Sequence, residues 1–281
     1  TVGGGSDTIA RLIAQGISAP LGQPVIIDNQ SGLRTGETGA KGAPDGYTLM
    51  VQGASLWILP LLQKTPWDVT RDFATISLIS RQVNVFCVHP SLPVKSVKEL
   101  IALARARPGE LNYASTIPGG LQHLATELLK SMTGIRMTWV PYKGGPAAMT
   151  ALMSGEVQVL ALDVGLVAPH VKSGKMRALA VTSATPSALA PDLPTVASAG
   201  VPGYELVGST GMFAPTKTPV AIINRVNQEV VRVLNQQDVR ERLLANGEEI
   251  VANSPEQFAA TIKLEIAKMS KVIKEANIKM E

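Results

Sequence analysis

Residues 1–16 read TVGGGSDTIARLIAQG: three glycines, a Ser-Asp pair, and then apolar residues at helical spacing. A glycine-rich turn at a helix N-terminus presents backbone N–H groups that can bind an anion. We expect a helix over about 6–19, with Ser6 or Asp7 as its N-cap. Such a turn could bind the phosphate of a nucleotide in an enzyme, or it could bind a carboxylate in a protein that catalyses no reaction.

The nucleotide alternative is tested by the spacing of the glycines. Gly3 and Gly5 fit the start of a dinucleotide-binding fingerprint, and Asp28 follows an apolar run at a suitable distance. The third glycine position is Thr8, where a side chain prevents close packing of helix on strand. No Gly-Lys-Ser/Thr follows the loop, so the P-loop pattern is absent from it. The sequence therefore disfavours a nucleotide, and we expect no cofactor.

Strand-like and helix-like segments alternate along most of the chain, which favours an α/β architecture with mainly parallel sheets. We predict strands at 24–28, 47–53, 83–90, 111–115, 137–142, 157–163 and 176–183. Helices are predicted over 96–110, 121–134, 146–155 and 220–236, with two more near the C-terminus. The expected helix starts are Ser96 with Glu99, Thr218 before Pro219, Asp238, and Ser254 with Gln257.

Composition narrows the functional classes. The chain has 4% aromatic residues and a net charge of +4, which is too little of either for a nucleic-acid surface. The single cysteine, Cys87, lies in an apolar run and is expected in the core. The histidines at 89, 123 and 170 lack metal-ligand spacing, and residues 53–57 (GASLW) miss the nucleophile elbow at the last position. We expect no catalytic and no metal site.

A second glycine-rich turn repeats the design of the first. Residues 113–129 read YASTIPGGLQHLATELL, so small hydroxyl residues and glycines again follow a strand and precede a helix. Either turn alone could be an ordinary strand–helix loop with an N-cap. Two such turns in different halves could instead face each other across a cleft and hold both ends of a dianion.

Several longer motifs occur in order along the chain: GGGSDTIAR, APDGYTL, YAS with GG and QHLATELL, VPYKGGPAAMTALMSGEVQ, GKMRALAVTS and LPTVASAGVPGYE. Together they resemble the Bug family, also called TctC, the substrate-binding proteins of tripartite tricarboxylate transporters. The resemblance covers nearly the whole chain, from Gly3 to the C-terminal helices.

The resemblance implies a bilobed type II periplasmic-binding-protein fold of α/β class, with two mixed-sheet lobes and a ligand cleft between them. The first lobe would comprise 1–101 plus 212–281, and the second 102–211. The family pattern places ligand-binding residues at Gly3, Gly4, Gly5, Ser6, Asp7 and Ser55, and at Ser115, Thr116, Gly119, Gly120, His123 and Asp163. These groups suit recognition of carboxylates through backbone N–H groups, hydroxyls and water.

The resemblance also implies a function. Such a protein is not an enzyme: it captures a small organic carboxylate (a di- or tricarboxylate, an acidic amino acid or an aromatic acid) by lobe closure. It is a periplasmic monomer that delivers the ligand to membrane permease subunits and binds no nucleic acid. The alternative is a ligand-sensing protein that feeds a signalling partner, and a third reading is a nucleotide-dependent α/β enzyme.

Two departures from the family pattern stand out. The family has a strand before the glycine loop, so we expect the native protein to carry residues ahead of Thr1. The loop at 29–46 is shorter than usual and carries Arg34 and Glu37, so either the loop is rebuilt in this protein or residues are missing from the sequence there. We therefore expect Arg34 to be a solvated loop residue, and Gly32 and Gly36 are not counted among the ligand contacts.

Overall fold

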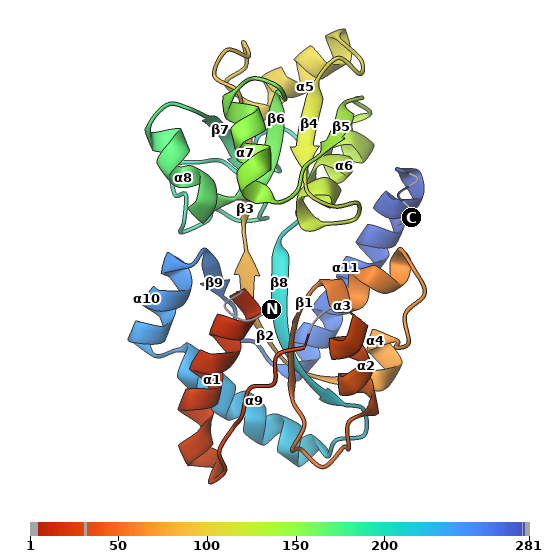
Figure 1. The fold of residues 1–281 in the computed structure, drawn as a ribbon, viewed down its shortest axis with the longest axis vertical. Coiled ribbons are helices and arrows are strands. Elements are labelled where there is room, and N and C mark those ends of the chain that lie inside the picture. Colours follow the sequence, from red (N-terminus) through yellow and green to blue (C-terminus); the bar gives the residue numbers. More distant parts are fainter. Residues whose placement is uncertain (1–4, 31–32, 277, 279–281) are drawn as a thin grey trace. The chain divides into compact units, whose positions relative to one another are not determined.

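The structure is a computed structural model that describes residues 5–30, 33–276 and 278. The chain forms two compact units, Thr1–Arg81 with Ser209–Ser270 and Gln82–Gly208 with Lys271–Glu281 (Figure 1). The second unit thus includes residues 82–101, which the sequence assigned to the first lobe. The predicted lobe boundaries themselves stay a prediction.

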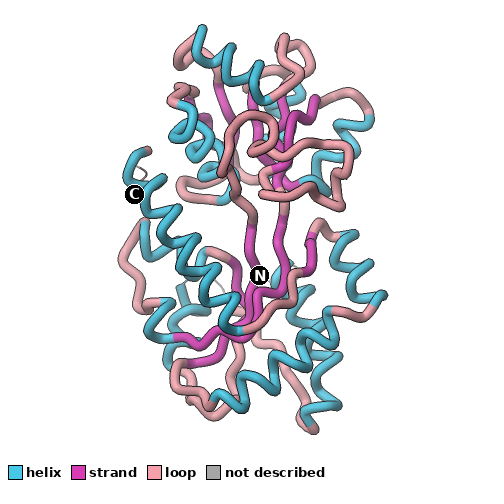
Figure 2. Tube along the Cα trace, turned by 180° about the vertical axis from the view of Figure 1, so that it is seen from behind, coloured by secondary structure: helices cyan, strands magenta, loops and turns pink. Residues whose placement is uncertain are grey.

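The first unit is built on a four-stranded sheet. Its strand order is β1 (Met50–Gly53), β8 (Gly208–Pro215), β2 (Phe73–Gln82) and β9 (Glu248–Ile250). Strands β1 and β8 are antiparallel. Helices α1 (Gly5–Leu21) and α9 (Val220–Leu234) pack their apolar residues on one face of this sheet. Helices α3 (Ser55–Ile58) and α11 (Pro255–Glu275) supply Trp57 and Phe258 to the other face, and α11 lies nearest the viewer from behind (Figure 2).

Side chains alternate along β8 between these two layers. Met212 and Ala214 belong to the core under α1 and α9, whereas Phe213 packs on Phe258 of α11 with ring centroids 5.0 Å apart. Gly211 lies on the same side as Phe213. A β-carbon at Gly211 would lie 2.1 Å from Cζ of Phe258, so the aromatic ring fills the space that a side chain would need. Position 211 therefore requires glycine, because the Phe258 ring lies too close to the backbone for any side chain.

The second unit is built on a five-stranded sheet. Its order is β5 (Thr138–Pro141), β4 (Asn112–Ser115), β6 (Val159–Asp163), β3 (Asn84–Val88) and β7 (Arg177–Val181). Strand β4 is parallel to β5 and β6, whereas β3 is antiparallel to β6 and β7. The sheet is therefore mixed, as the family resemblance implies. The mainly parallel sheets expected from alternation alone are wrong, because β3 runs antiparallel to both of its neighbours in this sheet and β1 runs antiparallel to β8 in the other.

Helices cover both faces of the five-stranded sheet. Helices α7 (Gly145–Met153) and α8 (Val164–Lys172) pack on one face with Val83, Val85 and Leu162. On the other face lies α6 (Leu121–Thr133), whose Ala125 carbonyl accepts a hydrogen bond of 2.8 Å from the buried Tyr204 hydroxyl. The α6 face carries the polar residues discussed below.

Two predicted helix starts are confirmed by their hydrogen bonds. Helix α5 (Val97–Ala106) begins after Ser96, whose Oγ accepts from the Glu99 N–H at 3.2 Å. Helix α11 begins with a reciprocal capping box. The Gln257 N–H donates to Ser254 Oγ at 3.3 Å, and the Ser254 N–H donates to Gln257 Oε1 at 3.0 Å.

Two other helix starts differ from the prediction by one or two residues. The N-cap of α9 is Pro219, because the Thr218 hydroxyl donates to the Pro215 carbonyl instead of capping the helix. Helix α10 (Gln237–Ala245) begins after Gln236, so Asp238 lies inside the first turn. Helix α8 is absent from the prediction because its sequence, VGLVAPHVK, contains a proline and reads as an apolar extension of the preceding strand.

Residues 24–28 do not form the predicted strand. They run as a loop in which the Ile26 side chain is 85% exposed, although an apolar run of this kind is typical of a buried strand. The predicted strand 47–53 is shortened to Met50–Gly53. Within the described residues, no strand lies beside 24–28 to pair with it, and apolar sequence alone cannot form a ladder.

Candidate functional site

The candidate site lies where two parallel strands of the second unit end. Ser115 is the last residue of β4 and Asp163 is the last residue of β6. The register pairs Ala114 with Leu160, so the two carboxyl ends are neighbours. A glycine-rich turn leads from Ser115 to α6, and α8 begins directly after Asp163. Carboxyl ends of parallel strands followed by helix N-termini are the usual location of ligand sites in α/β sheets.

Asn84 of β3 extends this edge. It lies directly opposite Asp163 in the antiparallel ladder. The adjacent pair is hydrogen-bonded through the Val164 N–H and the Val83 carbonyl at 3.1 Å. Asn84 and Asp163 therefore form a non-hydrogen-bonded pair, in which the Cα atoms are closest and the side chains share one face. That face is the α6 side, since Val83 and Leu162 belong to the core on the opposite side.

The three side chains are buried, and each leaves polar atoms unpaired. Ser115, Asp163 and Asn84 are 1%, 7% and 0% exposed. Within the described residues, Ser115 Oγ, Asp163 Oδ2 and both side-chain polar atoms of Asn84 have no hydrogen-bond partner. A buried unsatisfied polar group destabilises a protein by about 1–3 kcal/mol. A cluster of such groups on one face points to a ligand that supplies the missing partners.

The two carboxylate oxygens of Asp163 differ in their hydrogen bonds. Its Oδ1 accepts from the Leu166 N–H at 3.2 Å and so caps α8. Its Oδ2 is the unpaired atom. Burial raises the pKa of the Asp163 carboxyl, while the N–H groups of Leu166 and Gly165 act against this shift. A carboxyl of raised pKa gains a proton more readily, and in that form Oδ2 can donate a hydrogen bond to an anion.

His123 holds the turn between β4 and α6. The Gly119 N–H donates to His123 Nδ1 at 3.0 Å, which identifies Nδ1 as the unprotonated nitrogen. The ring lies 4.5 Å from that of Trp139, between centroids, and Nε2 lies 4.0 Å from Glu127 Oε1. Burial lowers the pKa of His123. At 5% exposure this side chain positions the turn, and Thr116 and Gly120 in the turn are more accessible.

The His123 contact gives a pH dependence that can be measured. Because the folded-state pKa lies below the value of 6.5 for an unperturbed histidine, the unfolded chain binds the proton more tightly. Stability is therefore complete above pH 6.5, falls as the pH drops below it, and levels off below the folded-state pKa. Each unit of depression is worth about 1.4 kcal/mol.

His123→Asn should remove this dependence. Asparagine places Oδ1 where Nδ1 lies, so the Gly119 N–H keeps an acceptor that does not titrate. Urea unfolding of both proteins between pH 8 and pH 4.5 measures the effect, with Glu127 and Lys130 unchanged in each. We expect the difference in unfolding free energy between them to narrow as the pH falls. Parallel curves over the whole range would contradict the assignment.

Not all of the ligand-binding residues predicted in the first unit lie within the described part of the chain. Gly3 and Gly4 lie outside the described residues, and Gly5 is the first residue of α1. Asp7 is buried, and its Oδ1 accepts from Asn29 Nδ2 at 2.9 Å and pairs with Arg11 Nε at 3.0 Å. Its carboxylate thus ties α1 to residues 24–30.

The remaining first-unit residues form no comparable cluster. Ser6 is half-buried in the first turn of α1. Ser55 is exposed at the start of α3, and Gln52 Nε2 donates to its Oγ at 3.4 Å. Because the two predicted residue sets lie in different units, their joint role stays a prediction.

Three residues outside the predicted ligand set can be assigned structural roles. Arg34 is exposed, as expected, but it lies on helix α2 (Leu33–Lys41) and not in a loop. A β-carbon at Gly36 would lie 2.7 Å from the Trp67 ring, so this glycine serves packing. Burial raises the pKa of the Cys87 thiol to about 12, which makes Cys87 an unreactive core residue.

Over residues 5–30, 33–276 and 278, none of the helices combines the length and the apolar character needed to cross a bilayer. The same residues contain no cluster of three or more His, Cys, Asp or Glu side chains that could hold a metal ion.

Asn84 is the residue that sequence reasoning missed. It is a polar residue inside the apolar run VNVFCV, where both neighbours point to the opposite core. A buried asparagine within a strand is a signal of a special role, but its cross-strand neighbour Asp163 cannot be read from local sequence.

The sequence of this chain matches a known protein family. The family model described as "Tripartite tricarboxylate transporter family receptor" (TctC) matches residues 9–278. Protein BugT of Bordetella pertussis is 33% identical over 286 residues, which cover 99% of this chain and 87% of the relative. A protein encoded in the gbd 5' region of Cupriavidus necator is 34% identical and covers 97% of this chain and 85% of its own length.

Two solved structures agree with the sequence relatives. The structure of R. palustris Rpa4515 with adipate is 37% identical, with a TM-score of 0.79, and covers 99% of this chain and 95% of that chain. The structure of MatC (Rpa3494) from Rhodopseudomonas palustris with bound malate is 30% identical, with a TM-score of 0.75. The match covers 97% of this chain and 96% of that chain. The chain belongs to the TctC family of tripartite tricarboxylate transporter receptors, the Bug proteins.

Proposed function

We propose that this protein is a periplasmic receptor that binds a small organic carboxylate, without catalysing a reaction, and delivers it to membrane permease subunits. The single observation that carries the proposal is the cluster of unpaired buried groups on Ser115, Asp163 and Asn84. Family membership supports it. Further support comes from two relatives whose structures contain adipate and malate, both dicarboxylates.

The chemistry of the cluster suits one end of such a ligand. Ser115 Oγ and Asn84 Nδ2 are donors for a carboxylate oxygen. The turn from Thr116 to Gly120 leads to the N-terminus of α6, where an anion is stabilised by the helix dipole. The N–H groups of Gly119 and Gly120 are themselves engaged, by His123 Nδ1 and the Ile117 carbonyl. A ligand carboxylate with these partners would satisfy groups that are otherwise buried without any.

The other end of the ligand is assigned to the first lobe. We place it at the glycine-rich turn, Gly3 to Asp7, and at Ser55, with Asp7 acting through the structure of the turn. Closure of the two lobes as a hinge would exclude water and strengthen the hydrogen bonds to the anion. The protein would act as a monomer, with lobes close to 1–101 plus 212–281 and 102–211.

A ligand panel tests the proposal. Succinate, adipate, malate, citrate, glutamate and benzoate are compared by thermal shift and then by calorimetry, with adipamide as the uncharged match for adipate. A ligand at 100 times its Kd adds about 2.7 kcal/mol of stability, and each kcal/mol raises Tm by about 2–4 °C. We expect at least one acid to shift Tm by about 5 °C or more and adipamide to be inert. Flat melting curves for every acid would argue against carboxylate binding.

A further inference from the structure

The unpaired atoms of the candidate site include acceptors that a carboxylate leaves unsatisfied. Ser115 Oγ and Asn84 Nδ2 can donate to a carboxylate, but Asp163 Oδ2 and Asn84 Oδ1 are acceptors, and neither has a partner among the described residues. A carboxylate has no proton to offer them. A buried acceptor without a donor destabilises the protein, and a buried charge without a partner does so more strongly. A ligand that satisfies the whole cluster therefore supplies a donor as well as an anion.

The need for a donor is greatest at Asp163. Burial raises the pKa of its carboxyl, and the groups that act against this shift are the N–H groups of Leu166 and Gly165, with no lysine or arginine of the described residues among them. A hydrogen bond or a positive charge offered to the ionised form lowers the pKa of a carboxyl group. A ligand donor beside Oδ2 would therefore hold Asp163 in its ionised form and satisfy its free oxygen.

The strand register brings these donors and acceptors onto one face of the sheet. Asn84 and Asp163 are directly opposite, yet their side chains do not hydrogen-bond to each other. Continuing the parallel register of Ala114 with Leu160 by one residue places Ser115 two residues before Asp163 on the neighbouring strand, and hence on the same face. Diagonal neighbours in a sheet are about 7–8 Å apart, so one small ligand group can reach both side chains. A carboxylate held by Ser115 and Asn84 would have the next carbon of the ligand within reach of Asp163.

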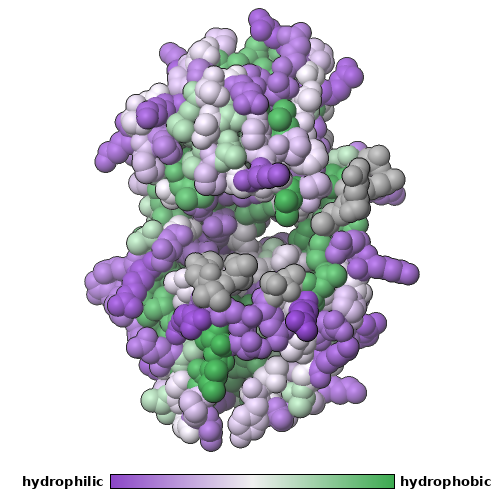
Figure 3. Space-filling view, viewed as in Figure 1, coloured by the Kyte–Doolittle hydropathy of each residue, from purple (hydrophilic) through white to green (hydrophobic). Residues whose placement is uncertain are grey.

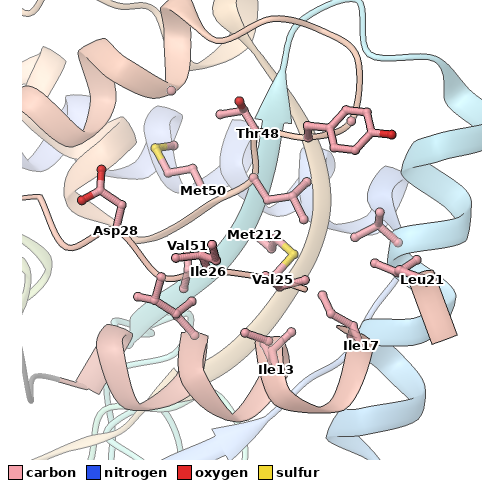
Figure 4. Close-up of a pocket in the computed structure, with 18 of the residues that line it drawn as sticks. Ile13, Ile17, Leu21, Val25, Ile26, Asp28, Thr48, Met50, Val51 and Met212 are labelled. Carbon is pink, nitrogen blue, oxygen red and sulfur yellow. The ribbon is translucent and has the colours of Figure 1, made fainter. Parts of the chain in front are cut away.

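The large cavity of the first unit has no comparable set of groups. Hydrophobic surface is open beside α1 in the space-filling view (Figure 3). The cavity, of about 830 Å³, is lined by aliphatic side chains that include Ile13, Ile17 and Met212 (Figure 4). Among its described lining residues, Arg225 is the single basic one beside three aspartates, and none has a buried side-chain polar atom without a partner. The matched donors and acceptors therefore belong to the second unit.

Given the carboxylate site proposed above, we propose that its ligand carries a hydrogen-bond donor, an ammonium or a hydroxyl group, on the carbon next to one carboxylate. The protein is then a receptor for 2-amino or 2-hydroxy acids. The ligand carboxylate accepts from Ser115 and Asn84, and the neighbouring ammonium or hydroxyl group donates to Asp163 Oδ2, while Oδ1 continues to cap α8. Asp163 determines specificity, since it selects among acids whose carboxylates the other two side chains bind alike.

Ligands that differ only at this carbon test the proposal. Two sets are compared by calorimetry at pH 8: succinate, malate and aspartate, and adipate, 2-hydroxyadipate and 2-aminoadipate. Loss of the substituent removes a hydrogen bond to a charged group, so in whichever set binds we expect a Kd about tenfold or more lower for a substituted acid than for the unsubstituted one. The tighter of the amino and hydroxy acids identifies the donor. Equal or tighter binding of succinate or adipate would overturn the proposal and leave the carboxylate receptor standing, whereas no binding of any acid would refute both.

Asp163→Asn assigns the preference to one side chain. Asparagine keeps Oδ1 as the cap of α8, a position where Asn and Asp are equally favourable, and it replaces the acceptor Oδ2 by a donor. We expect the preference for the substituted acid to vanish or reverse. Asp238→Asn, at an exposed position in the first turn of α10, is the control and should leave the ratio of Kd values unchanged. A ratio that survives Asp163→Asn would overturn the proposal, because asparagine mimics a protonated Asp163 that donates to the carboxylate instead.

Discussion

Asn84→Leu should raise the melting temperature of the ligand-free protein and weaken its binding of a carboxylate at the same time. Asn84 is fully buried, and neither of its side-chain polar atoms has a hydrogen-bond partner within the described residues. Leucine has a similar shape and no polar atom to satisfy, so the substitution removes a penalty of about 1–3 kcal/mol. At about 2–4 °C per kcal/mol, Tm should rise by several degrees.

The loss of binding follows from the same atoms. A hydrogen bond to a charged group contributes about 1.5–3 kcal/mol, and 1.4 kcal/mol is a factor of ten in affinity. We therefore expect Kd for the ligand found in the panel to rise by about tenfold or more. Calorimetry on the same preparation used for the melting curves measures both effects on one sample.

Thr182→Val is the matched control. Thr182 is also fully buried beside Asn84, but its hydroxyl is satisfied: it accepts from the Asn84 N–H and donates to the Asn84 carbonyl, both at 3.1 Å. Removing it leaves a backbone donor unpaired, so Tm should fall. Changes in Tm of opposite sign for the two substitutions would distinguish a side chain that binds the ligand from one that stabilises the fold. A fall in Tm for Asn84→Leu with unchanged affinity would show that Asn84 only stabilises the fold.

The parts of this site that the sequence predicts are those defined by short separations. Ser115, the glycine turn and α6 follow one another within 20 residues, so spacing alone indicates a polar turn at a helix start. Asp163 ends an apolar run and precedes a helix. Asn84 was missed because its role depends on the antiparallel register of β3 with β6, a contact across 79 residues in the chain. Register between distant strands is decided by packing, which local patterns do not encode.

The same reasoning explains the error at residues 24–28. Their apolar sequence is that of a buried strand, but a strand exists only where a neighbour completes its hydrogen bonds. The apolar composition predicted a tendency of residues 24–28 to form a strand. It could not predict that the described residues would contain no neighbouring strand to pair with them. The capping boxes at Ser96 and Ser254 were predictable because donor, acceptor and helix lie within four residues.

Gly211→Ala should destabilise the first unit by about 1–3 kcal/mol because the added methyl group would collide with Phe258. Its carbon would lie 2.1 Å from Cζ and 2.5 Å from Cε1 of a ring that is fully buried. That ring is held by Trp57 and Phe213, with centroids at 6.0 and 5.0 Å, so it has little room to move away. Gly53→Ala on the neighbouring strand is the control, since its nearest atom, the Ser209 carbonyl oxygen, would lie at 3.6 Å.

A double-mutant cycle turns the collision into a quantitative prediction. Phe258→Ala alone should lower the free energy of unfolding by about 3–5 kcal/mol, because it opens a cavity. In the double variant, the methyl group at position 211 occupies part of that cavity instead of striking a ring. The combined loss should therefore fall short of the sum of the single losses by about 1–3 kcal/mol, as for residues in direct contact. Urea unfolding of the four proteins measures this coupling. Additive losses would mean that the ring rotates away from Gly211 at no cost, and that the close approach does not explain the glycine.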